Sequence, residues 1–437
     1  MGSQISLECR ARAGNRPIII IVGGGYGGVA LARELDRSGQ FFTMLIDRKD
    51  YYLHNIAALR ASVEDGFSHK ICVPYSKLFL KGNGFFIHGE VTAINDDNIT
   101  INGYNEPVSF NYCVIATGSS YAFPCKVAEP HSEQAFQRYN RVVQDVKSST
   151  NIVVVGGGPV GVELTGEIGS VYRDKKVYLI HSGKQLIGDQ FDNKLSAKLM
   201  KQLTEIGVQV ILEDRLDLGA ELKRDTQNYV KLDKIESLTT AKGRSVYADC
   251  FFNCTGVYIN SNSWSSTLSD AVDLSSGRLK TDNHLQVINH PKLFAIGDAN
   301  SMQNAQAFYA GSQAAYLSQY LPKLNVVKTM KPYQPSNSLI MSVPIGKNKG
   351  VTQLGSMILG SRLTSIIKGK TLFVGNAYKA LNVKLPSDGK FIMDDNQKLS
   401  NDEIENLSKQ SGLTRKFVEA VMEGFLELPL AEGQQHV

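Results

Sequence analysis

Two glycine clusters are the residues of this sequence whose types and spacing best suit the binding of a nucleotide. Each follows the spacing G-x-G-x-x-G, in which the first glycine allows a tight turn, the second lets backbone approach a pyrophosphate, and the third lets helix and strand pack closely. The N-terminus of the helix adds free N–H groups and a positive dipole end. The first cluster contains Gly23, Gly24, Gly25, Tyr26, Gly27 and Gly28, and the second contains Gly156, Gly158 and Gly161. We therefore predict two sites that each cradle a pyrophosphate.

One polar residue follows each cluster, at the end of the next apolar run. Asp47 ends "TMLID" 19 residues after Gly28, and His181 ends "VYLIH" 20 residues after Gly161. An acid at this position accepts hydrogen bonds from ribose hydroxyls. The two copies agree in layout and differ in this one side chain. Glycine turns that bind no nucleotide are the alternative interpretation.

Three further apolar runs end in short polar turns. These turns contain Ala116, Thr117 and Gly118, then Thr255 and Gly256, and then Gly297 and Asp298. A carboxylate at the carboxyl end of a strand faces the crevice in which α/β proteins bind ligands, where it suits a ribityl or phosphate-linked hydroxyl. Ordinary strand punctuation is the alternative for any one of these turns.

The elements that position these residues are two repeated βαβ units. "IIIIV" precedes the first glycine cluster and "NIVVV" precedes the second, and an amphipathic segment follows each cluster. Buried apolar strands that alternate with helices are typical of parallel sheets. The sequence therefore predicts an α/β fold with one dinucleotide held by each half.

Composition bounds the remaining possibilities. A chain of 437 residues is too long for one core, so two or three domains are expected. The net charge of +5 comes without a dense Lys/Arg run, so no specific nucleic acid partner is expected. The six cysteines are scattered without a CxxC motif, which favours reduced thiols and predicts no metal site. No apolar run approaches the ~20 residues of a membrane span.

The N-terminal segment "MGSQIS" fits the motif for N-myristoylation of Gly2. One acyl chain binds a membrane marginally, and Arg10, Arg12 and Arg16 form a basic cluster that suits a second signal. We therefore expect a membrane surface as a partner. A chance match in a flexible leader is the alternative.

Several stretches together resemble a known family. They are "MGSQ", "HNIAALRASVEDGF", "VVVGGGPVGVE", "LIHS", "DNHLQV" and "AIGD". With these the chain resembles the ferroptosis suppressor protein and apoptosis-inducing-factor homologue family, FAD-dependent NAD(P)H:quinone oxidoreductases related to type II NADH dehydrogenases. The resemblance implies a two-dinucleotide-binding flavoprotein with a glutathione-reductase-like architecture. The implied parts are a flexible lipidated N-terminus (1–16), an FAD domain (17–125 and 266–325), a nested NAD(P)H domain (126–265), an interface domain (326–390) and a helical tail (391–437).

The resemblance also implies roles for individual residues. The first glycine cluster would hold the FAD pyrophosphate and Asp47 its ribose. The other implied FAD contacts are Arg60, Val91 through its backbone, and Asp298 at the ribityl chain. Glu163 would lie near the region where flavin and nicotinamide stack, Lys368 near the isoalloxazine, and Phe373 near a quinone entrance. A solvated lysine on a basic amphipathic stretch is the alternative for Lys368.

His181 predicts the choice of nicotinamide cofactor. An acid would repel the 2′-phosphate of NADPH, whereas His181, with Ser182 and Lys184 beside it, does not. We therefore expect the second site to accept NADPH alongside NADH. A histidine that only fills the end of the strand is the alternative.

The expected activity is electron transfer from NAD(P)H through FAD to a membrane quinone of the ubiquinone type. The segment "RKDYYLHNIAALR" has no cysteine where disulfide reductases carry their redox pair, which leaves a cysteine-independent acceptor. The resemblance implies protection of lipids from peroxidation, on the cytoplasmic face of the plasma membrane, lipid droplets or the mitochondrial outer membrane, with a cytosolic pool. Two alternatives stay open: a soluble reductase of a ferredoxin-like protein or of monodehydroascorbate, and a non-enzymatic, nucleic-acid-binding pro-death protein.

The chain continues some 50 residues past the point where the family members end. Ser400 and Glu403 fit a capping box, and Gly412 separates two short amphipathic segments, the second of which Thr414 can cap. The residues able to bury one face are Ile404, Leu407, Leu413, Phe417, Val421 and Phe425. Packing on the preceding domain is the simplest expectation, with a partner protein or a membrane as alternatives.

Overall fold

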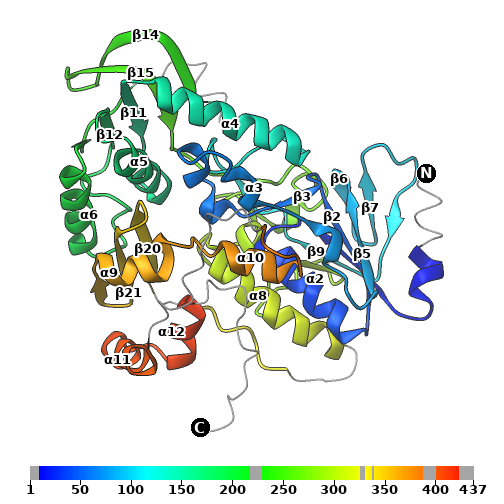
Figure 1. The fold of residues 1–437 in the computed structure, drawn as a ribbon. Helices are drawn as coiled ribbons and strands as arrows, with labels where there is room; N and C mark the ends of the chain where they lie inside the picture. Colours follow the sequence, from blue (N-terminus) through cyan, green and yellow to red (C-terminus); the bar gives the residue numbers. More distant parts are fainter. Residues whose placement is uncertain (1–8, 217–228, 325–329, 337–338, 387–399, 423–437) are drawn as a thin grey trace.

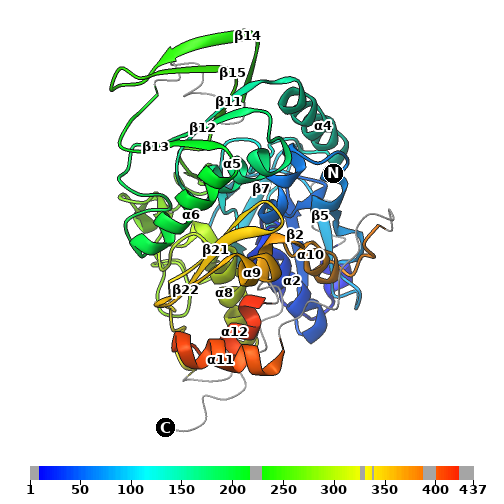
Figure 2. The same ribbon diagram turned by 60° about the vertical axis from the view of Figure 1, so that its left-hand side comes forward.

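A computed structural model describes residues 9–216, 229–324, 330–336, 339–386 and 400–422. Gly2 and Phe425 lie outside these residues, as does the side chain of Phe417. Figures 1 and 2 show two sheets with their helices, a smaller three-stranded sheet beside them and a pair of helices near the C-terminus.

The first sheet has five parallel strands in the order β19-β9-β1-β2-β5. Its strands are β1 (Ile18–Val22), β2 (Phe42–Asp47), β5 (Gly84–His88), β9 (Tyr112–Ile115) and β19 (Leu293–Ala295). The helices α2 (Tyr26–Ser38) and α8 (Ala307–Tyr320) pack against each other beside this sheet. Both β1 and β2 are almost completely buried, as is typical of parallel sheets: β1 is an unbroken apolar run, and β2 is apolar apart from the buried Thr43 and its last residue, Asp47.

The second sheet repeats this layout in the order β13-β12-β11-β15-β14. Four strands are parallel, namely β11 (Asn151–Val155), β12 (Lys176–Ile180), β13 (Val208–Ile211) and β15 (Ser245–Asn253), and β14 (Val230–Thr239) is antiparallel to β15. Its helices are α5 (Pro159–Val171) and α6 (Asn193–Glu205). The predicted α/β fold with a repeated βαβ unit is confirmed.

The third part of the molecule is an antiparallel sheet of β20 (Ile340–Ile345), β21 (Lys349–Leu354) and β22 (Met357–Leu359). It packs on α5 and α6, and it is followed by α9 (Ser361–Thr364), the π-helix η7 (Ser365–Gly369) and α10 (Val374–Ala380). Two more helices, α11 (Asn401–Ser411) and α12 (Arg415–Met422), lie at the edge of this part (Figure 2). The predicted capping box of Ser400 and Glu403 is present, and Gly412 ends α11 in the left-handed conformation.

Smaller elements connect these parts. The short strands are β3 (Tyr51–Leu53), β4 (Cys72–Pro74), β6 (Val91–Ile94), β7 (Asn98–Ile101), β8 (Val108–Ser109), β10 (Ser119–Ser120), β16 (Tyr258–Ile259), β17 (Val272–Asp273) and β18 (Arg278–Leu279). The remaining α-helices are α3 (Ser68–Ile71) and α4 (Ser132–Ser148). The 3₁₀ turns are η1 (Asn55–Ala57), η2 (Arg60–Ser62), η3 (Tyr75–Lys77), η4 (Ser269–Ala271), η5 (Gly297–Ala299) and η6 (Leu321–Lys323). Within the described residues, no helix combines the length and apolar character needed to cross a bilayer.

Candidate functional site

A single cavity of about 1130 Å³ joins the two glycine clusters. It lies at the carboxyl ends of the strands of both sheets, and the three-stranded sheet and η7 form another part of its wall. The predicted site residues that line it are Gly23, Gly24, Gly25, Tyr26, Gly27, Asp47, Val91, Ala116, Thr117, Gly118, Gly156, Gly158, Glu163, His181, Gly256, Gly297, Asp298 and Lys368. Phe373 lines it as well.

The first glycine turn connects β1 to α2. Gly23 has a φ of +109°, which strongly favours glycine, and its N–H donates to the carbonyl of Ile46 at 2.8 Å. A Cβ on Gly28 would lie 1.9 Å from the carbonyl oxygen of Gly23, so Gly28 serves the packing of helix on turn and does not line the cavity. A Cβ on Gly25 meets open space instead, and no side chain caps α2. The N-terminal N–H groups of α2 therefore face the cavity free of a side-chain cap.

Asp47 stands at the end of β2, beside this turn. Its Oδ2 accepts a hydrogen bond from the N–H of Gly24 at 2.6 Å, and its Oδ1 accepts one from the N–H of Lys49 at 2.8 Å. These two bonds fix the carboxylate at the cavity wall, which Val91 also lines. A carboxylate held in this way retains acceptor capacity for ribose hydroxyls.

The second glycine turn has the same construction. Gly156 has a φ of +116°, a Cβ on Gly161 would lie 1.8 Å from the carbonyl oxygen of Gly156, and Gly158 faces open space at the start of α5. Gly161, like Gly28, packs helix on turn and does not line the cavity. Val22 pairs with Ile46 in the first sheet, and Val155 pairs with Ile180 in the second. The residues that directly follow Ile46 and Ile180 therefore occupy equivalent positions in the two units.

His181 therefore takes the position in the second unit that Asp47 has in the first. Its ring lies against the backbone of Gly157, where an added Cβ would come within 2.5 Å of the ring. Burial lowers the pKa of His181 below its usual value, so the imidazole is neutral at pH 7. The side chain thus offers no negative charge at this wall. Ser182 also lines the cavity, whereas Lys184 does not.

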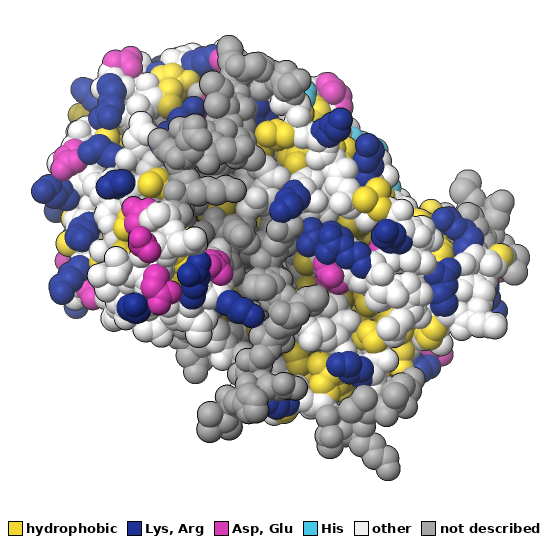
Figure 3. All heavy atoms as spheres, turned by 60° about the horizontal axis from the view of Figure 1, so that its bottom comes forward, with side chains coloured by type: hydrophobic (Ala, Val, Ile, Leu, Met, Phe, Trp, Pro, Cys, Tyr) yellow, Lys and Arg dark blue, Asp and Glu magenta, His cyan; other side chains and the backbone are white. Residues whose placement is uncertain are grey.

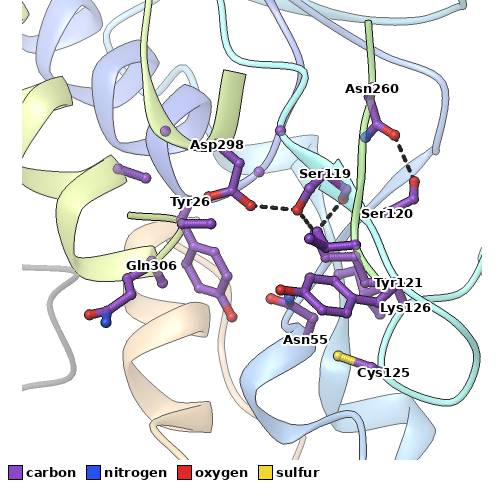
Figure 4. Close-up of a pocket in the computed structure, with 18 of the residues that line it drawn as sticks. Tyr26, Asn55, Ser119, Ser120, Tyr121, Cys125, Lys126, Asn260, Asp298 and Gln306 are labelled. Carbon is purple, nitrogen blue, oxygen red and sulfur yellow. Dashed lines mark hydrogen bonds between the residues drawn. The ribbon is translucent and has the colours of Figure 1, made fainter. Parts of the chain in front are cut away.

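Asp298 is connected to a polar group that the sequence interpretation missed (Figure 4). Its Oδ2 accepts a hydrogen bond from Ser119 Oγ, and the Nζ of Lys126 donates to the hydroxyl and the carbonyl of Ser119. Burial lowers the pKa of Lys126, although the charge of Asp298 opposes this. Nearby, Asn260 Nδ2 donates to the carbonyl of Thr117 at 2.8 Å. Ser119 and Lys126 stand in unremarkable sequence surroundings, so only the fold could identify them.

The structure brings Glu163 and Lys368 together across 205 residues of sequence. Lys368 Nζ lies 2.7 Å from Glu163 Oε1, the side chains are 14% and 9% exposed, and Lys368 also donates to the carbonyl of Ser342 at 3.2 Å. Burial raises the pKa of Glu163, while the ammonium of Lys368 acts in the opposite direction. The alternative of a solvated Lys368 is therefore wrong. The pair places two titratable groups at the cavity wall.

Arg60 lies away from the cavity wall. Its guanidinium forms a bidentate ion pair with Glu167 on α5 at 2.8 Å, with both side chains almost fully buried. It also donates to the carbonyls of Gly369 at 2.7 Å and Lys370 at 3.1 Å. The expectation that Arg60 contacts FAD is corrected accordingly. The N–H groups of its guanidinium are directed to α5 and to the end of η7, and these bonds compensate for the burial of the charge.

His54 does not line the cavity but contacts the lining residue Tyr26, a role that its sequence position did not reveal. Tyr26 Oη lies 3.2 Å from His54 Nδ1, and His54 Nε2 lies 2.7 Å from the carbonyl of Leu372. Burial lowers the pKa of His54 to about 4, so the ring is neutral at pH 7 and can bond both partners. Leu372 and Phe373 both have positive φ angles, 47° and 58°. The histidine thus ties the wall residue Tyr26 to the turn that presents Phe373.

The described residues fit one dinucleotide at each glycine turn. Both turns leave open space at the second glycine, both offer helix N-termini without side-chain caps, and the cavity continues between them. Gly23–Gly27, Asp47, Ser119 and Asp298 would hold FAD, and Gly156–Gly158 with His181 would hold NAD(P)H. When bound, the flavin supplies acceptance of a hydride and delivery of electrons. No cluster of described residues is suited to hold a metal ion.

Comparisons with known proteins agree with this geometry. The family model "Pyridine nucleotide-disulphide oxidoreductase" matches residues 17–314. Ferroptosis suppressor protein 1 of Homo sapiens is 35% identical over 391 residues, which cover 88% of this chain and all of that protein. Apoptosis-inducing factor homolog B of Dictyostelium discoideum is 33% identical over 384 residues, covering 84% of this chain and 97% of that one.

Solved structures share the fold at low identity. The sulfide:quinone oxidoreductase from Aquifex aeolicus has a TM-score of 0.66 at 15% identity, covering 86% of this chain and 94% of that one. The water-forming NADH oxidase from Lactobacillus brevis, bound to NADH, has a TM-score of 0.58 at 19% identity, covering 77% and 75%.

The fold and the cavity define a flavoprotein oxidoreductase that uses FAD and NAD(P)H. More particularly, the chain belongs to the pyridine nucleotide-disulphide oxidoreductase family, in the group of ferroptosis suppressor proteins and apoptosis-inducing factor homologues. The predicted family, the class of NAD(P)H-dependent flavoprotein oxidoreductases and the cofactors FAD and NAD(P)H are thereby confirmed.

Proposed function

We propose that this enzyme passes electrons from NAD(P)H through FAD to a membrane quinone of the ubiquinone type, and that the quinol formed protects lipids from peroxidation. The observation that carries the proposal is an apolar end of the cavity next to the Glu163–Lys368 pair. Its apolar residues are Ile56, Phe308, Ile340, Met341, Ile367 and Phe373. Such a surface suits a flat, weakly polar ring, and the paired polar groups suit its oxygens.

The cysteines support an acceptor other than a protein disulfide. None of the six, all of which lie within the described residues, forms a disulfide, and Cys125 and Cys254 line the cavity. Burial raises the pKa of Cys125 to about 11 and that of Cys254 further, so neither is a thiolate at pH 7. Because the thiolate is the reactive form, thiol–disulfide exchange has no ready nucleophile here.

The names of two similar proteins support the proposal. Ferroptosis suppressor protein 1 is named for a role against ferroptosis, and one solved neighbour is a sulfide:quinone oxidoreductase. A membrane quinone requires the enzyme to work at a membrane surface. We therefore place it on the cytoplasmic face of membranes, attached through an acylated Gly2.

Reduction of a quinone to a quinol takes up two electrons and two protons. Glu163 and Lys368 are titratable groups on the wall at the apolar end, so we assign them to proton delivery and to binding of a quinone oxygen. General acid–base groups of this kind contribute about 10²–10⁴-fold to a rate. Lys368 acts through its Nζ, which Glu163 Oε1 orients at 2.7 Å.

The test is steady-state turnover of the purified flavoprotein with NADH or NADPH and a short-chain ubiquinone. We expect Glu163→Ala to lower quinone-dependent turnover by about tenfold or more, while FAD remains bound. The matched control is Glu205→Ala, since Glu205 forms a surface ion pair with Lys349 at 2.5 Å outside the cavity. Wild-type kinetics in Glu163→Ala would end its assignment.

The electron acceptor that the wild-type enzyme reduces decides between the proposed function and the two alternatives. Absence of quinone reduction by the wild-type enzyme, together with rapid reduction of an iron–sulfur protein, would overturn the proposal in favour of a soluble reductase. Tight, salt-sensitive binding of DNA without turnover would favour the non-enzymatic alternative.

A further inference from the structure

The helices α11 and α12 cover the apolar end of the cavity. The ferroptosis suppressor proteins of Homo sapiens and Xenopus tropicalis are matched over their full length, but only 88% of this chain is matched, so this chain carries residues that they do not. We expect these extra residues at the C-terminal end, where α11 and α12 stand. The contacts of these two helices therefore bear on how this enzyme differs from its relatives.

The contacts of the helix pair are apolar and directed inward. Leu407 of α11 and Val418 and Val421 of α12 are 5%, 0% and 2% exposed. They belong to one cluster with residues of the cavity wall, namely Phe308, Ile340, Ile367 and Phe373. A long ion pair between Arg362 and Glu403, at 3.9 Å and largely exposed, adds little to the attachment. The burial of apolar side chains thus holds the pair in place.

Val421 reaches the cavity itself. It is a lining residue together with Ile367, Lys368 and Phe373, and α12 packs on η7, which carries Lys368. A side chain on the extension thus stands at the same end of the cavity as the Glu163–Lys368 pair. This position is the one that a ring bound beside Lys368 would meet.

We propose that α11 and α12 form the outer wall of the acceptor site, with Val421 setting the size of the ring that can bind beside Lys368. The inference rests on the proposed function for the chemistry of the occupant, a flat quinone-type ring. This wall is apolar, as a flat ring requires, and it comes from α11 and α12 instead of from the three-stranded sheet of β20, β21 and β22. The extension is thereby a determinant of acceptor specificity.

The experiment compares wild type, Val421→Trp and Val421→Ala in rapid mixing, with flavin reduction by NADH and reoxidation by quinone measured separately. Trp would fill the site, so we expect reoxidation by ubiquinone-1 to slow by about fivefold or more, because one extra or missing methylene group in an apolar pocket already alters discrimination by about 10–200-fold. Ala would widen the site, so the rate ratio of bulky ubiquinone-1 to small 1,4-benzoquinone should rise by about threefold. Flavin reduction by NADH should stay within about twofold of wild type in both.

Lys409→Trp is the matched control, because Lys409 lies on α11 with its side chain 70% exposed. It introduces the same bulk outside the cavity and should leave both half-reactions at wild-type rates. Should Val421→Trp fail to fold, Val421→Ala still decides through the ratio of the two quinones. Equal reoxidation of wild type, Val421→Trp and Val421→Ala by every acceptor would overturn the proposal.

Failure of the proposed function gives a different result. If wild-type reduced flavin is reoxidised by the dye 2,6-dichlorophenolindophenol but by neither quinone, the quinone function fails. Slower dye reduction by Val421→Trp than by wild type and Lys409→Trp would then still support the proposal that α11 and α12 form the outer wall of the acceptor site. Equal dye reduction by the three proteins would overturn it.

Discussion

Asp47 and His181 show how one side chain can specialise two copies of the same unit. They follow equivalent strand pairs, and both line the cavity. Asp47 is fixed by the N–H groups of Gly24 and Lys49 and is acidic where a ribose with free hydroxyls would bind. His181 is neutral at pH 7, since burial lowers its pKa, and it presents no charge that would repel a phosphate.

At the residue scale we predict that His181→Asp makes the enzyme discriminate against NADPH. Two unit charges 4 Å apart interact by about 1 kcal/mol in water and by about 4 kcal/mol at an effective dielectric constant of 20, so a carboxylate should lower kcat/KM for NADPH relative to NADH by about tenfold or more. The measurement is the ratio of kcat/KM for the two cofactors.

Lys184→Ala is the control for that substitution, because Lys184 stands nearby in sequence but does not line the cavity. It should shift the ratio by less than about twofold. A His181→Asp enzyme with the wild-type ratio would show that the 2′-phosphate does not reach this strand end. A wild-type enzyme that binds NADH and rejects NADPH would contradict the expectation for the cofactor itself.

At the scale of elements, the glycines of the β1–α2 turn divide into two tasks. Gly28 leaves no room for a Cβ, which would lie 1.9 Å from the carbonyl oxygen of Gly23. Gly25 leaves open space on the cavity side. The same division applies to Gly161 and Gly158 in the β11–α5 turn. The motif therefore combines one position that holds the element together with one position that keeps space for a ligand.

We predict opposite outcomes for alanine at these two positions. Gly25→Ala should leave the free energy of unfolding of the FAD-free protein within about 1 kcal/mol of wild type while weakening FAD binding, because its methyl group enters the space for the pyrophosphate. Gly28→Ala should lower stability and FAD content together, because the backbone contact cannot relax without moving α2. The measurements are denaturant unfolding of the FAD-free protein and FAD content after purification.

The two glycines serve as controls for each other. Loss of stability in Gly25→Ala as large as in Gly28→Ala would contradict the division of tasks. Full FAD content in Gly25→Ala would show that the pyrophosphate does not approach this glycine.

At the scale of the whole molecule, Arg60 joins the three parts. Arg60 lies in η2 and pairs with Glu167 on α5 of the second unit. It also donates to the carbonyls of Gly369, at the end of η7, and of Lys370, which belong to the third part of the molecule. Removal of one partner from a buried ion pair typically costs about 3–5 kcal/mol. The pair therefore helps to keep Lys368 at a constant position relative to Glu163.

One face of the molecule carries a mixture of charged and apolar side chains. Figure 3 shows Lys and Arg side chains over the face at the bottom of Figure 1, with acidic and hydrophobic side chains among them. The charged groups do not gather into one continuous basic surface in this view of the described residues. The hypothesis for attachment to a membrane remains the N-terminal segment, whose Gly2 lies outside the described residues.

We predict that Gly2→Ala moves the full-length protein from the membrane to the soluble fraction of cells. The acyl chain supplies about 0.8 kcal/mol per buried CH₂, and the substitution removes its attachment site. NAD(P)H oxidation with a short-chain quinone in detergent should stay at the wild-type rate, because the substitution lies far from the cavity in sequence. Ser3→Ala is the control that keeps Gly2, and an unchanged distribution of Gly2→Ala would refute acylation as the anchor.

The sequence by itself determined the repeated βαβ units, the two glycine turns, Asp47, His181 and Asp298, because these depend on local rules: strand burial, the φ angles of a tight turn and the edge at which parallel strands end. Only the tertiary structure decided which distant residues meet. It paired Lys368 with Glu163, directed Arg60 to Glu167 instead of the cavity, joined Lys126 and Ser119 to Asp298, and brought Val421 to the acceptor end. Such contacts join segments up to hundreds of residues apart, and they follow from the packing of whole layers, for which no local spacing in the sequence carries a signal.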